Sequence, residues 1–406
     1  MIINPSKPLF LNRKIRPLTL ALPLFTPPRP LEQLPYPKLR SLVAHSSPGG
    51  SSRIHIGWVI SGGFPKEDFE IDIRDLLNHI VIVGVTGTGK TNTALTLAAA
   101  LLQKGRQVAV LDWHGEYAIL KKLNATLIRL DGSVSINLLE LLGEDTVVDT
   151  INLVVDAFAF SFDFTAPQVF MFREALLYAL ASTKSGSEMP SLTEIVENIR
   201  DMYPRSRFDH EIKMALLRRL QPLTEGRIAR VFDSHPKMSL KNLLEKQSVI
   251  FDLSPVRGLR TRVLLALLLL RALYSFEYGH GFSSELRRLT IIEEARHLVP
   301  ARREYDKPSP IEFMIGELRK YGCGVLTISQ SPNHIAQDVL RDSGFLFAHR
   351  LYALDDIRVI QRMMGGIEED LLKQLPVGYA LVRYPIGACV SMVEIMPVKE
   401  ILPVDR

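Results

Sequence analysis

The residues most clearly suited to chemistry form a glycine-rich stretch that ends in lysine and threonine. Gly84, Gly87, Gly89, Lys90 and Thr91 fit the pattern G-x-x-x-x-G-K-[ST], the signature of a phosphate-binding P-loop. The glycines allow successive backbone N–H groups to point at one phosphate. Lys90 supplies a charge to the β and γ phosphates, and the hydroxyl of Thr91 suits Mg²⁺. This stretch therefore predicts nucleotide binding.

Two carboxylates follow an apolar run later in the chain. Leu289–Ile292 has the composition of a buried strand, and Glu293 and Glu294 come directly after it. This is a Walker B arrangement, in which one carboxylate supports the Mg²⁺ shell and the other orients and deprotonates the attacking water. We assign the metal role to Glu293, together with Thr91, and the general-base role to Glu294.

Other polar residues are expected at the same edge of a sheet. Asp112 and Glu116 follow the apolar run 107–111, and Gln330 follows the run 324–329. In open α/β sheets, ligands bind at the carboxyl ends of the strands. Glu116 is the alternative general base, and Gln330 is a candidate to sense the γ phosphate or position water, although an ordinary strand end also explains it. The residues predicted to bind the nucleotide are Gly84, Val85, Thr86, Gly87, Thr88, Gly89, Lys90, Thr91, Asn92 and Asp112.

The elements that must position these residues alternate between strands and helices. The apolar run 80–83 predicts a strand that leads into the P-loop, and 92–103 predicts the helix after it. The alternation favours an α/β fold with a mostly parallel sheet flanked by helices. Further strands are expected at 54–60, 69–73, 107–111, 126–130, 248–253, 289–292, 324–329, 345–351, 379–383 and 390–395.

Strand signals fade between about 137 and 246, where helices are expected instead. Ser191 and Glu194 form a capping box ahead of an apolar periodic stretch, and 166–182 and 208–220 have helical patterns. We therefore predict an all-helical insertion in the sheet. Its arginines fit a solvated helix face or, alternatively, a DNA contact; they are Arg218, Arg219, Arg227 and Arg230.

The first part of the chain differs in composition from the rest. Residues 1–60 hold ten of the 25 prolines and eight of the 49 basic residues, but only one acidic residue, Glu32. Because proline removes backbone donors, we expect 1–53 to be a basic, proline-rich arm or a small β region, followed by one domain over 54–406. Such a basic segment suits either a nucleic acid or acidic partner or a solvated tail.

Cysteine and hydropathy bound the cellular setting. Cys323 and Cys389 are the only cysteines, so no disulfide framework is expected, and a reducing, cytoplasmic setting is the simplest interpretation. The longest apolar run, 263–270, is far shorter than the roughly 20 residues that span a bilayer. It predicts a buried helix, and we expect neither export nor a membrane span.

Several motifs in order resemble the HerA and FtsK branch of P-loop motor ATPases, most closely the archaeal HerA group. They cover roughly residues 54–395 and are far more specific together than the P-loop alone. The matching pieces are Leu77-Asn78-His79, Asp112-x-His114-Gly115-Glu116-Tyr117, Glu293-Glu294-Ala295, Glu317-x-Arg319-Lys320-Tyr321-Gly322, Ser329-Gln330-x-Pro332 and Leu375-Pro376-x-Gly378.

The resemblance implies a RecA-like core that hydrolyses ATP with Mg²⁺ and moves double-stranded DNA through a hexameric ring. It also implies that ATP lies between subunits and that an arginine of the neighbouring subunit reaches the γ phosphate. On matching position that arginine is Arg319, although a helix-surface arginine is the plain alternative. Arg257, Arg260 and Arg262, expected in a loop before the 263 helix, are candidates for pore contacts with DNA. A nuclease partner of the NurA type is implied as well.

The chain departs from this family in three places. Asn78 stands where many relatives have arginine, Arg296 lies between Ala295 and His297 where relatives run alanine directly into histidine, and the N-terminal region is short and proline-rich. Two other functions stay open. One is a conjugative or viral DNA-pumping ATPase of the same superfamily, and the other is a nucleotide-dependent scaffold without motor activity.

Overall fold

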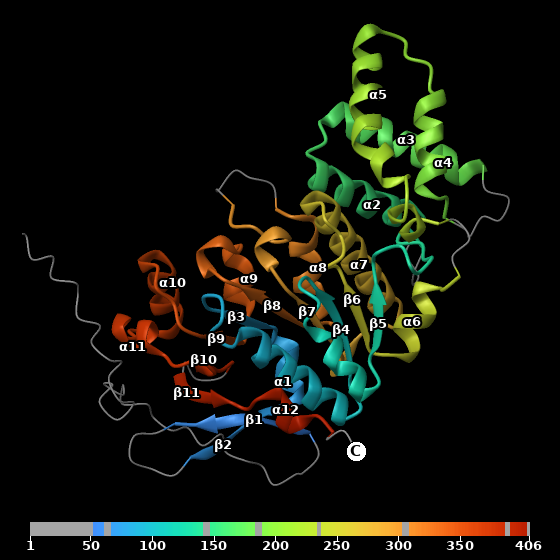
Figure 1. The fold of residues 1–406 in the computed structure, drawn as a ribbon. Coiled ribbons are helices and arrows are strands. Elements are labelled where there is room, and N and C mark those ends of the chain that lie inside the picture. The colour runs from blue at the N-terminus through green and yellow to red at the C-terminus, as the bar shows by residue number, and fades with distance from the viewer. Residues whose placement is uncertain are drawn as a thin grey trace, which may run out of the picture. The chain divides into compact units, whose positions relative to one another are not determined.

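The computed structural model describes residues 52–60, 66–140, 147–182, 189–233, 237–302, 308–385 and 390–403. The predicted N-terminal arm over 1–53 lies outside the described residues, except for Ser52 and Arg53. The described chain is an eleven-stranded sheet with helices packed on it, shown in Figure 1. The strand order is β2-β1-β11-β10-β9-β3-β8-β7-β4-β6-β5.

The sheet has a parallel part and an antiparallel part. Parallel pairing runs from β9 to β5, and antiparallel pairing joins β9 to β10, β10 to β11, β11 to β1 and β1 to β2. This confirms the mostly parallel α/β sheet. The strands are β1 (Arg53–Val59), β2 (Glu67–Asp72), β3 (Ile80–Val83), β4 (Gln107–Asp112), β5 (Thr126–Arg129), β6 (Val249–Asp252), β7 (Ser283–Ile292), β8 (Tyr321–Ser329), β9 (Phe345–Ala348), β10 (Tyr379–Arg383) and β11 (Val390–Ile395).

Each predicted strand is present. β1 and β2 begin one and two residues early, β9 ends at Ala348 and not at 351, and β7 and β8 begin earlier by a wider margin. β7 starts at Ser283 and not at Leu289, because its first residues include charged side chains that interrupt the apolar run. β8 starts at Tyr321, three residues before the predicted start. The carboxyl ends matter more for function. Val83 pairs with Ser329 and Ile292 pairs with Thr327, so the loops after β3, β7 and β8 emerge at one edge of the sheet.

Helices cover both faces of the parallel part. The connection from β3 to β4 crosses the sheet in one direction, and those from β6 to β7, β7 to β8 and β8 to β9 cross it in the other. Because such crossovers are right-handed, α1 (Lys90–Gln103) lies on the face opposite to α7 (Leu259–Gly279), α8 (Pro310–Leu318) and α9 (Gln337–Asp342). The C-terminal helix α12 (Val398–Ile401) packs on α1.

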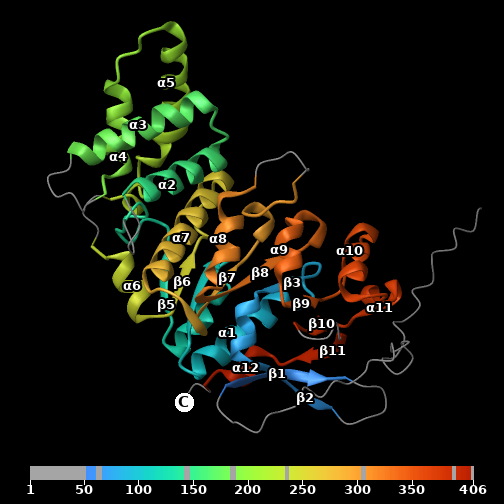
Figure 2. The same cartoon turned by 180° about the vertical axis from the view of Figure 1, so that it is seen from behind.

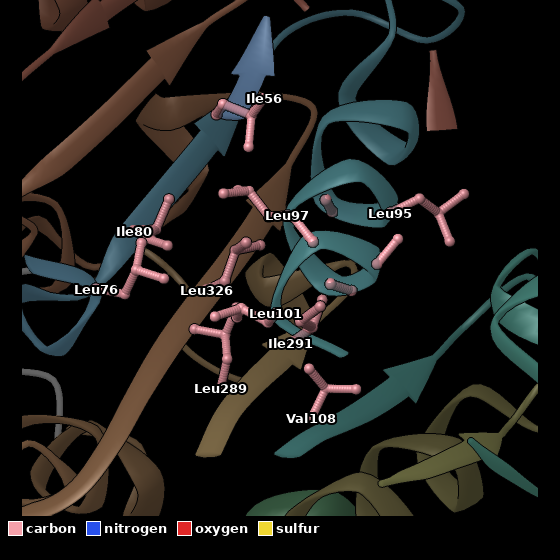
Figure 3. Close-up of a cluster of buried hydrophobic side chains, with 14 of the residues drawn as sticks. Ile56, Leu76, Ile80, Leu95, Leu97, Leu101, Val108, Leu289, Ile291 and Leu326 are labelled. Atoms are coloured by element: carbon pink, nitrogen blue, oxygen red, sulfur yellow. The ribbon is translucent and has the colours of Figure 1, made fainter. Parts of the chain in front are cut away.

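A dense apolar core lies beneath the P-loop helix. Leu97 and Leu101 of α1 meet Ile80 of β3, Leu326 of β8 and Ile291 of β7 in one buried cluster, shown in Figure 3. All five side chains are fully buried. Burying each such side chain contributes on the order of 1.5–3 kcal/mol. The cluster therefore holds the start of α1 in a fixed position relative to the ends of β3, β7 and β8.

The predicted helical insertion is present between β5 and β6. Its helices are α2 (Val147–Phe162), α3 (Ala166–Ser182), α4 (Leu192–Asp201), α5 (Arg207–Leu220) and α6 (Leu240–Lys246), and α2 packs against α7, as Figure 2 shows from behind. The capping box of Ser191 and Glu194 is confirmed at the start of α4. In the core of the insertion, Phe158 packs against Phe172 and Phe232 with tilted rings.

The four arginines of this insertion divide into two kinds. Arg219 donates to Gln168 Oε1 at 2.9 Å, and Arg230 donates to the carbonyl of Gly132 at 3.3 Å. Arg218, Arg227 and Arg230 are exposed. Arg219 therefore links two helices of the insertion, Arg230 links the insertion to the segment after β5, and a DNA contact stays an alternative prediction for the exposed arginines.

On the apolar run 263–270, the structure agrees with the predicted buried helix. Val263 to Leu270 lie inside α7 and are buried by the sheet and the insertion. Among the described residues, no helix combines the length and the apolar composition that crossing a bilayer requires.

Two α-helices follow β9: α10 (Leu354–Met364) and α11 (Glu369–Gln374). A 3-10 turn, Ile73–Asn78, leads into β3. His79, which links this turn to β3, has a positive φ of 60° and is buried.

Candidate nucleotide-binding site

The P-loop joins β3 to α1 through three glycines with positive φ. These angles are 152° at Gly84, 80° at Gly87 and 109° at Gly89, in the region that side chains rarely adopt. Lys90 then begins α1, and its Nζ donates to the carbonyl of Val85 at 2.9 Å. Burial lowers the pKa of the Lys90 ammonium, while the carboxylates of nearby glutamates oppose that shift. Lys90 is therefore a partly buried cation with the carboxyl groups of Glu294, Glu293 and Glu116 nearby.

Two other segments hold the P-loop in place. The N–H of Val85 donates to the carbonyl of Arg350 at 2.9 Å, and the N–H of Gly378 donates to the carbonyl of Thr88 at 3.0 Å. A Cβ added to Gly84 would lie 2.6 Å from Cβ of His349. The loop after β9 and the loop before β10 therefore fix the P-loop from outside.

His349 is the centre of this support. Its Nδ1 lies 2.8 Å from the carbonyl of Tyr379, and its Nε2 lies 2.9 Å from Oγ1 of Thr93 on α1. Because a carbonyl only accepts, Nδ1 carries the proton and Nε2 accepts from Thr93. Burial lowers the pKa of His349 to about 4, so the ring is neutral near pH 7.

Asp112 shapes the turn after β4. Its Oδ1 accepts the backbone N–H groups of His114, Gly115 and Glu116 at 3.2, 2.7 and 3.2 Å, and its Oδ2 accepts that of Tyr117 at 3.0 Å. The side chain is fully buried, and burial raises the pKa of its carboxyl group. The structure thus places Asp112 in the turn that presents His114 and Glu116 to the pocket, which Asp112 itself does not line.

Glu293 lies at the buried end of β7. Its Oε2 accepts the backbone N–H of Trp113 at 2.9 Å. Burial, with added repulsion from Asp112, raises its pKa to about 8. The ring of Trp113 stacks on the ring of His297, with the two centroids 5.7 Å apart. The guanidinium carbon of Arg262 lies over the Trp113 ring, 5.4 Å from its centroid. Glu293 is therefore a rigidly held carboxyl group whose ionised form needs a nearby cation.

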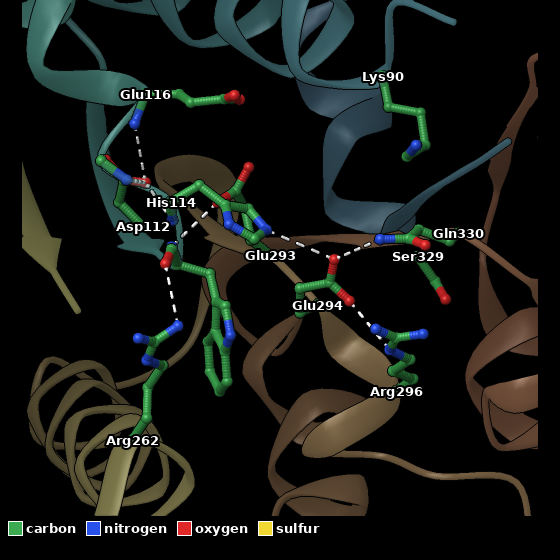
Figure 4. A network of polar contacts seen from close by, with 12 residues as sticks. Lys90, Asp112, His114, Glu116, Arg262, Glu293, Glu294, Arg296, Ser329 and Gln330 are labelled. Carbon is green, nitrogen blue, oxygen red and sulfur yellow. Dashed lines mark hydrogen bonds and ion pairs between the residues drawn. The ribbon is translucent and has the colours of Figure 1, made fainter. Parts of the chain in front are cut away.

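The carboxylate of Glu294 contacts three side chains, shown in Figure 4. Gln330 Nε2 donates to its Oε1 at 2.9 Å, and His114 Nε2 lies 3.5 Å from the same oxygen. Arg296 Nε lies 3.0 Å from Oε2. The backbone of Glu294 is left-handed, with φ 48° and ψ 42°. Non-glycine residues held in this conformation cluster at functional sites.

These groups surround one pocket of about 530 Å³, a size within the usual range for a small-molecule site. The pocket brings together most of the predicted site residues, but Gly84, Val85, Thr88 and Asp112 do not line it. Asn92 does line it, yet its amide is bound to the backbone of Met396 and Val398. The lining residues are Thr86, Gly87, Gly89, Lys90, Thr91, Asn92, His114, Glu116, Glu293, Glu294, Ile328, Ser329, Gln330 and Val377.

The donor set fits a nucleotide with Mg²⁺. Lys90 and the P-loop glycines Gly87 and Gly89 line the pocket, and Thr91 and Glu293, which line it as well, offer hard oxygen ligands. In the part of the chain that the structure describes, no three His, Cys, Asp or Glu side chains are grouped to hold a metal ion by themselves. In phosphate sites Mg²⁺ takes one or two protein ligands and completes its shell with phosphate oxygens and water, and Thr91 and Glu293 fit such a pair of ligands.

Arg319 lies far from this pocket. It caps the C-terminal end of α8, just before β8, whereas the pocket lies after the other end of that strand. Nine residues at about 3.3 Å each separate the two ends by about 30 Å. Arg319 is exposed and cannot reach the nucleotide pocket of its own chain.

The predicted pore arginines are placed differently from the expectation. α7 begins at Leu259, so Arg260 and Arg262 lie in its first turn and not in a loop, because the helix starts four residues before the apolar run. Arg262 donates to the carbonyls of Ser254 and Val256, and Arg260 pairs with Asp163 of the insertion at 2.8 Å. Only Arg257 stays in the loop.

Sequence reasoning missed the supports of the site. His349 directly follows β9, as Glu293 directly follows β7, but the predicted strand 345–351 extended past it, so its place at a strand end was missed. Trp113, Arg262 and His297 carry no such signal, because their contact depends on three segments that meet only in the folded chain.

Comparison with known proteins gives a family match and several relatives. The family model described as "Helicase HerA, central domain" matches residues 54–273. The chain is 22% identical over 373 residues to the probable DNA double-strand break repair helicase HerA of Methanocaldococcus jannaschii, covering 81% of this chain and 73% of that protein. It is 22% identical over 351 residues to the DNA double-strand break repair helicase HerA of Sulfolobus acidocaldarius, covering 82% of this chain and 66% of that protein.

Solved structures share the fold. VirB4 of Thermoanaerobacter pseudethanolicus superposes with a TM-score of 0.66 at 19% identity, covering 86% of this chain and 97% of that one. The plasmid coupling protein TrwB in complex with ADP and Mg²⁺ superposes with a TM-score of 0.62 at 14% identity, covering 86% and 96%. These likenesses show a RecA-like P-loop fold for the described chain.

Proposed function

The chain belongs to the family described as helicase HerA, central domain, and we propose that it is an ATPase that drives the movement of double-stranded DNA. One observation carries this proposal. A single pocket unites the P-loop residues Lys90 and Thr91 with Glu293, Glu294 and Gln330, which come from the ends of two other parallel strands. Binding alone would need only the P-loop, whereas a carboxylate pair and an amide at the same pocket suit hydrolysis.

Each residue has a role that follows from its place. The P-loop and Lys90 bind and orient the phosphates, and Thr91 and Glu293 would hold Mg²⁺. Bound Mg²⁺ would neutralise charge that develops on the phosphates. Glu294 would accept a proton from the attacking water at Oε1, where Gln330 also donates. Glu116 lines the same pocket and is the alternative base.

A second copy of the chain would complete the site. The pocket has three carboxyl groups and one lysine, and a nucleoside triphosphate brings further negative charge, so a cation in addition to Mg²⁺ would be favourable there. Arg319 is exposed about 30 Å away at the opposite edge of the sheet. A head-to-tail contact that repeats until it closes generates a ring, and it would bring Arg319 of each copy to the pocket of the next. We propose the hexameric ring on this ground and on the family relation.

The surface beside Arg319 has the character of a contact surface. Phe282 is 78% exposed and stacks on Tyr321, and Tyr278, also exposed, packs edge-on against the same ring. Aromatic side chains are enriched at protein interfaces because they bury a large area at low cost in conformational entropy. This aromatic surface therefore supports a contact with a neighbouring copy next to Arg319.

The test is ATP hydrolysis by the purified protein with and without linear double-stranded DNA, at low and moderate salt, with Lys90→Ala as the blank. We expect turnover to rise with duplex DNA, and the stimulation to fade with salt because phosphate contacts release counterions. Turnover that is the same with and without DNA would contradict the motor and favour the nucleotide-dependent scaffold. A DNA-stimulated protein found only in a membrane or capsid assembly would favour the DNA-pumping alternative.

A further inference from the structure

Arg296 makes a contact with Glu294 that differs from the other contacts of that residue. Gln330 and His114 approach Oε1, and both side chains line the nucleotide pocket. Arg296 approaches Oε2 and does not line the pocket. Figure 4 shows the two oxygens held in this way, one by the groups on the pocket side and one by the guanidinium. The carboxylate thus has a front oxygen and a rear oxygen.

The rear oxygen depends on Arg296 alone. Glu294 is only 8% exposed, and its Oε2 has no hydrogen-bond partner of good geometry among the described residues. The ion pair with Arg296 Nε, at 3.0 Å, is the contact that compensates for its burial. A buried carboxylate oxygen without a partner is costly, so the side chain would turn or take up another conformation if the guanidinium were removed.

Two features of the site add to this dependence. The carboxyl group of Glu116 lines the same pocket, so an unpaired Glu294 carboxylate would face a like charge there. The left-handed backbone of Glu294 also fixes the direction in which its side chain leaves the chain. Arg296 lies two residues later, in the 3-10 turn Ala295–His297, and so reaches Oε2 from the side opposite to the pocket.

We propose that Arg296 is a positioning residue for catalysis: it holds Glu294 by the rear oxygen so that the front oxygen, Oε1, faces the attacking water. This inference rests on the proposed ATPase function. It assigns a role to the extra arginine between Ala295 and His297. In the reaction, water gives a proton to Oε1 of Glu294 while its oxygen attacks the γ phosphorus, and the bond from that phosphorus to the β–γ bridging oxygen breaks.

The test compares three substitutions at one position in the full-length protein. Arg296→Ala removes the cation, Arg296→Gln keeps a polar side chain without charge, and Arg296→Lys restores a charge that can pair with a carboxylate. We expect kcat to fall about tenfold in the first two and to recover at least threefold in the third, with KM for ATP unchanged throughout. Arg341→Ala is the matched control, because Arg341 is exposed on α9 and pairs only loosely with Asp338, at 3.8 Å.

The outcomes separate this inference from the proposed function. Hydrolysis by the wild type that equals the Lys90→Ala blank would overturn both. Clear hydrolysis by the wild type with an unchanged or raised kcat in Arg296→Ala would overturn only the positioning role. So would a fall in kcat matched by a rise in KM and a lower thermal midpoint, since that pattern marks a general structural role. Recovery by lysine but not by glutamine, at constant KM, supports the proposal.

Discussion

Acid should weaken the support of the P-loop through His349. The ring is fully buried, donates to the carbonyl of Tyr379 and accepts from Thr93 of α1. Burial lowers the pKa of His349 to about 4 from 6.5, and the nearby charge of Lys90 acts in the same direction. Below pH 6.5 the unfolded chain therefore binds a proton that the folded chain refuses, so stability falls as the pH falls through the window from 6.5 to 4.

The size of the effect follows from these two pKa values. Between pH 7 and pH 5 one such histidine costs the folded state about 2 kcal/mol. His79, whose pKa burial also lowers to about 4, costs a similar amount. Glu293 acts in the opposite direction, because its raised pKa of about 8 makes the folded chain bind a proton more tightly below that pH. The total change in the wild type is thus a sum of opposing parts, whereas a difference between two proteins isolates His349.

The assay is urea unfolding of the wild type and of His349→Gln at pH 7 and pH 5. Glutamine does not titrate in this pH range, and the loss of the two hydrogen bonds of the His349 ring lowers stability equally at both pH values. When the pH is lowered from 7 to 5, we expect the variant to lose about 2 kcal/mol less stability than the wild type loses. The same pH-dependent change in both proteins would refute a buried, neutral His349.

Three further substitutions test the scaffold. Arg288→Met leaves Glu277 buried without its ion pair of 2.7 Å, and urea unfolding should show a loss of about 3–5 kcal/mol; a loss below 1 kcal/mol would contradict the buried pair. Gly324→Ala places a Cβ 2.5 Å from the backbone carbonyl of Leu76, in the 3-10 turn before β3, and should cost about 1–3 kcal/mol by the same measurement; a neutral result would show that β8 can shift. Arg262→Ala should change the fluorescence of the tryptophan below its guanidinium, while Arg260→Ala, which breaks an exposed pair, should not; equal spectra for both would contradict the stacking.

The sequence predicted the sheet well because apolar runs bounded by polar residues mark buried strands. The ends that carry chemistry, at Val83, Ile292 and Ser329, were predicted at the residues where the structure has them. Strand starts were less predictable. The first three residues of β7, Ser283 to Glu285, are polar and at least partly exposed, so burial does not select apolar side chains there. The early start of α7 was missed for the same reason, since Arg260 and Arg262 interrupt the apolar pattern.

For the site, the sequence predicted which residues lie at strand ends, but not which groups their side chains bind. Asp112 was predicted to bind the nucleotide because it lies at a strand end, yet its carboxylate accepts hydrogen bonds from four backbone N–H groups of its own turn. Asn92 looked available, but its amide binds the backbone after β11. Such assignments depend on local hydrogen-bond geometry and on segments distant in sequence, which periodicity does not encode.

The most direct test of the account is mixing two inactive variants. Lys90→Ala lacks a working pocket but retains Arg319, and Arg319→Ala has the pocket but lacks the arginine. If each site is completed by a neighbouring copy, co-assembled subunits should regain up to about a quarter of wild-type hydrolysis, because about a quarter of the random contacts join an intact pocket to an intact arginine. Mixing Lys90→Ala with the double variant should regain none. Turnover in the first mixture no greater than the sum of its inactive parts, despite confirmed co-assembly, would contradict the shared site.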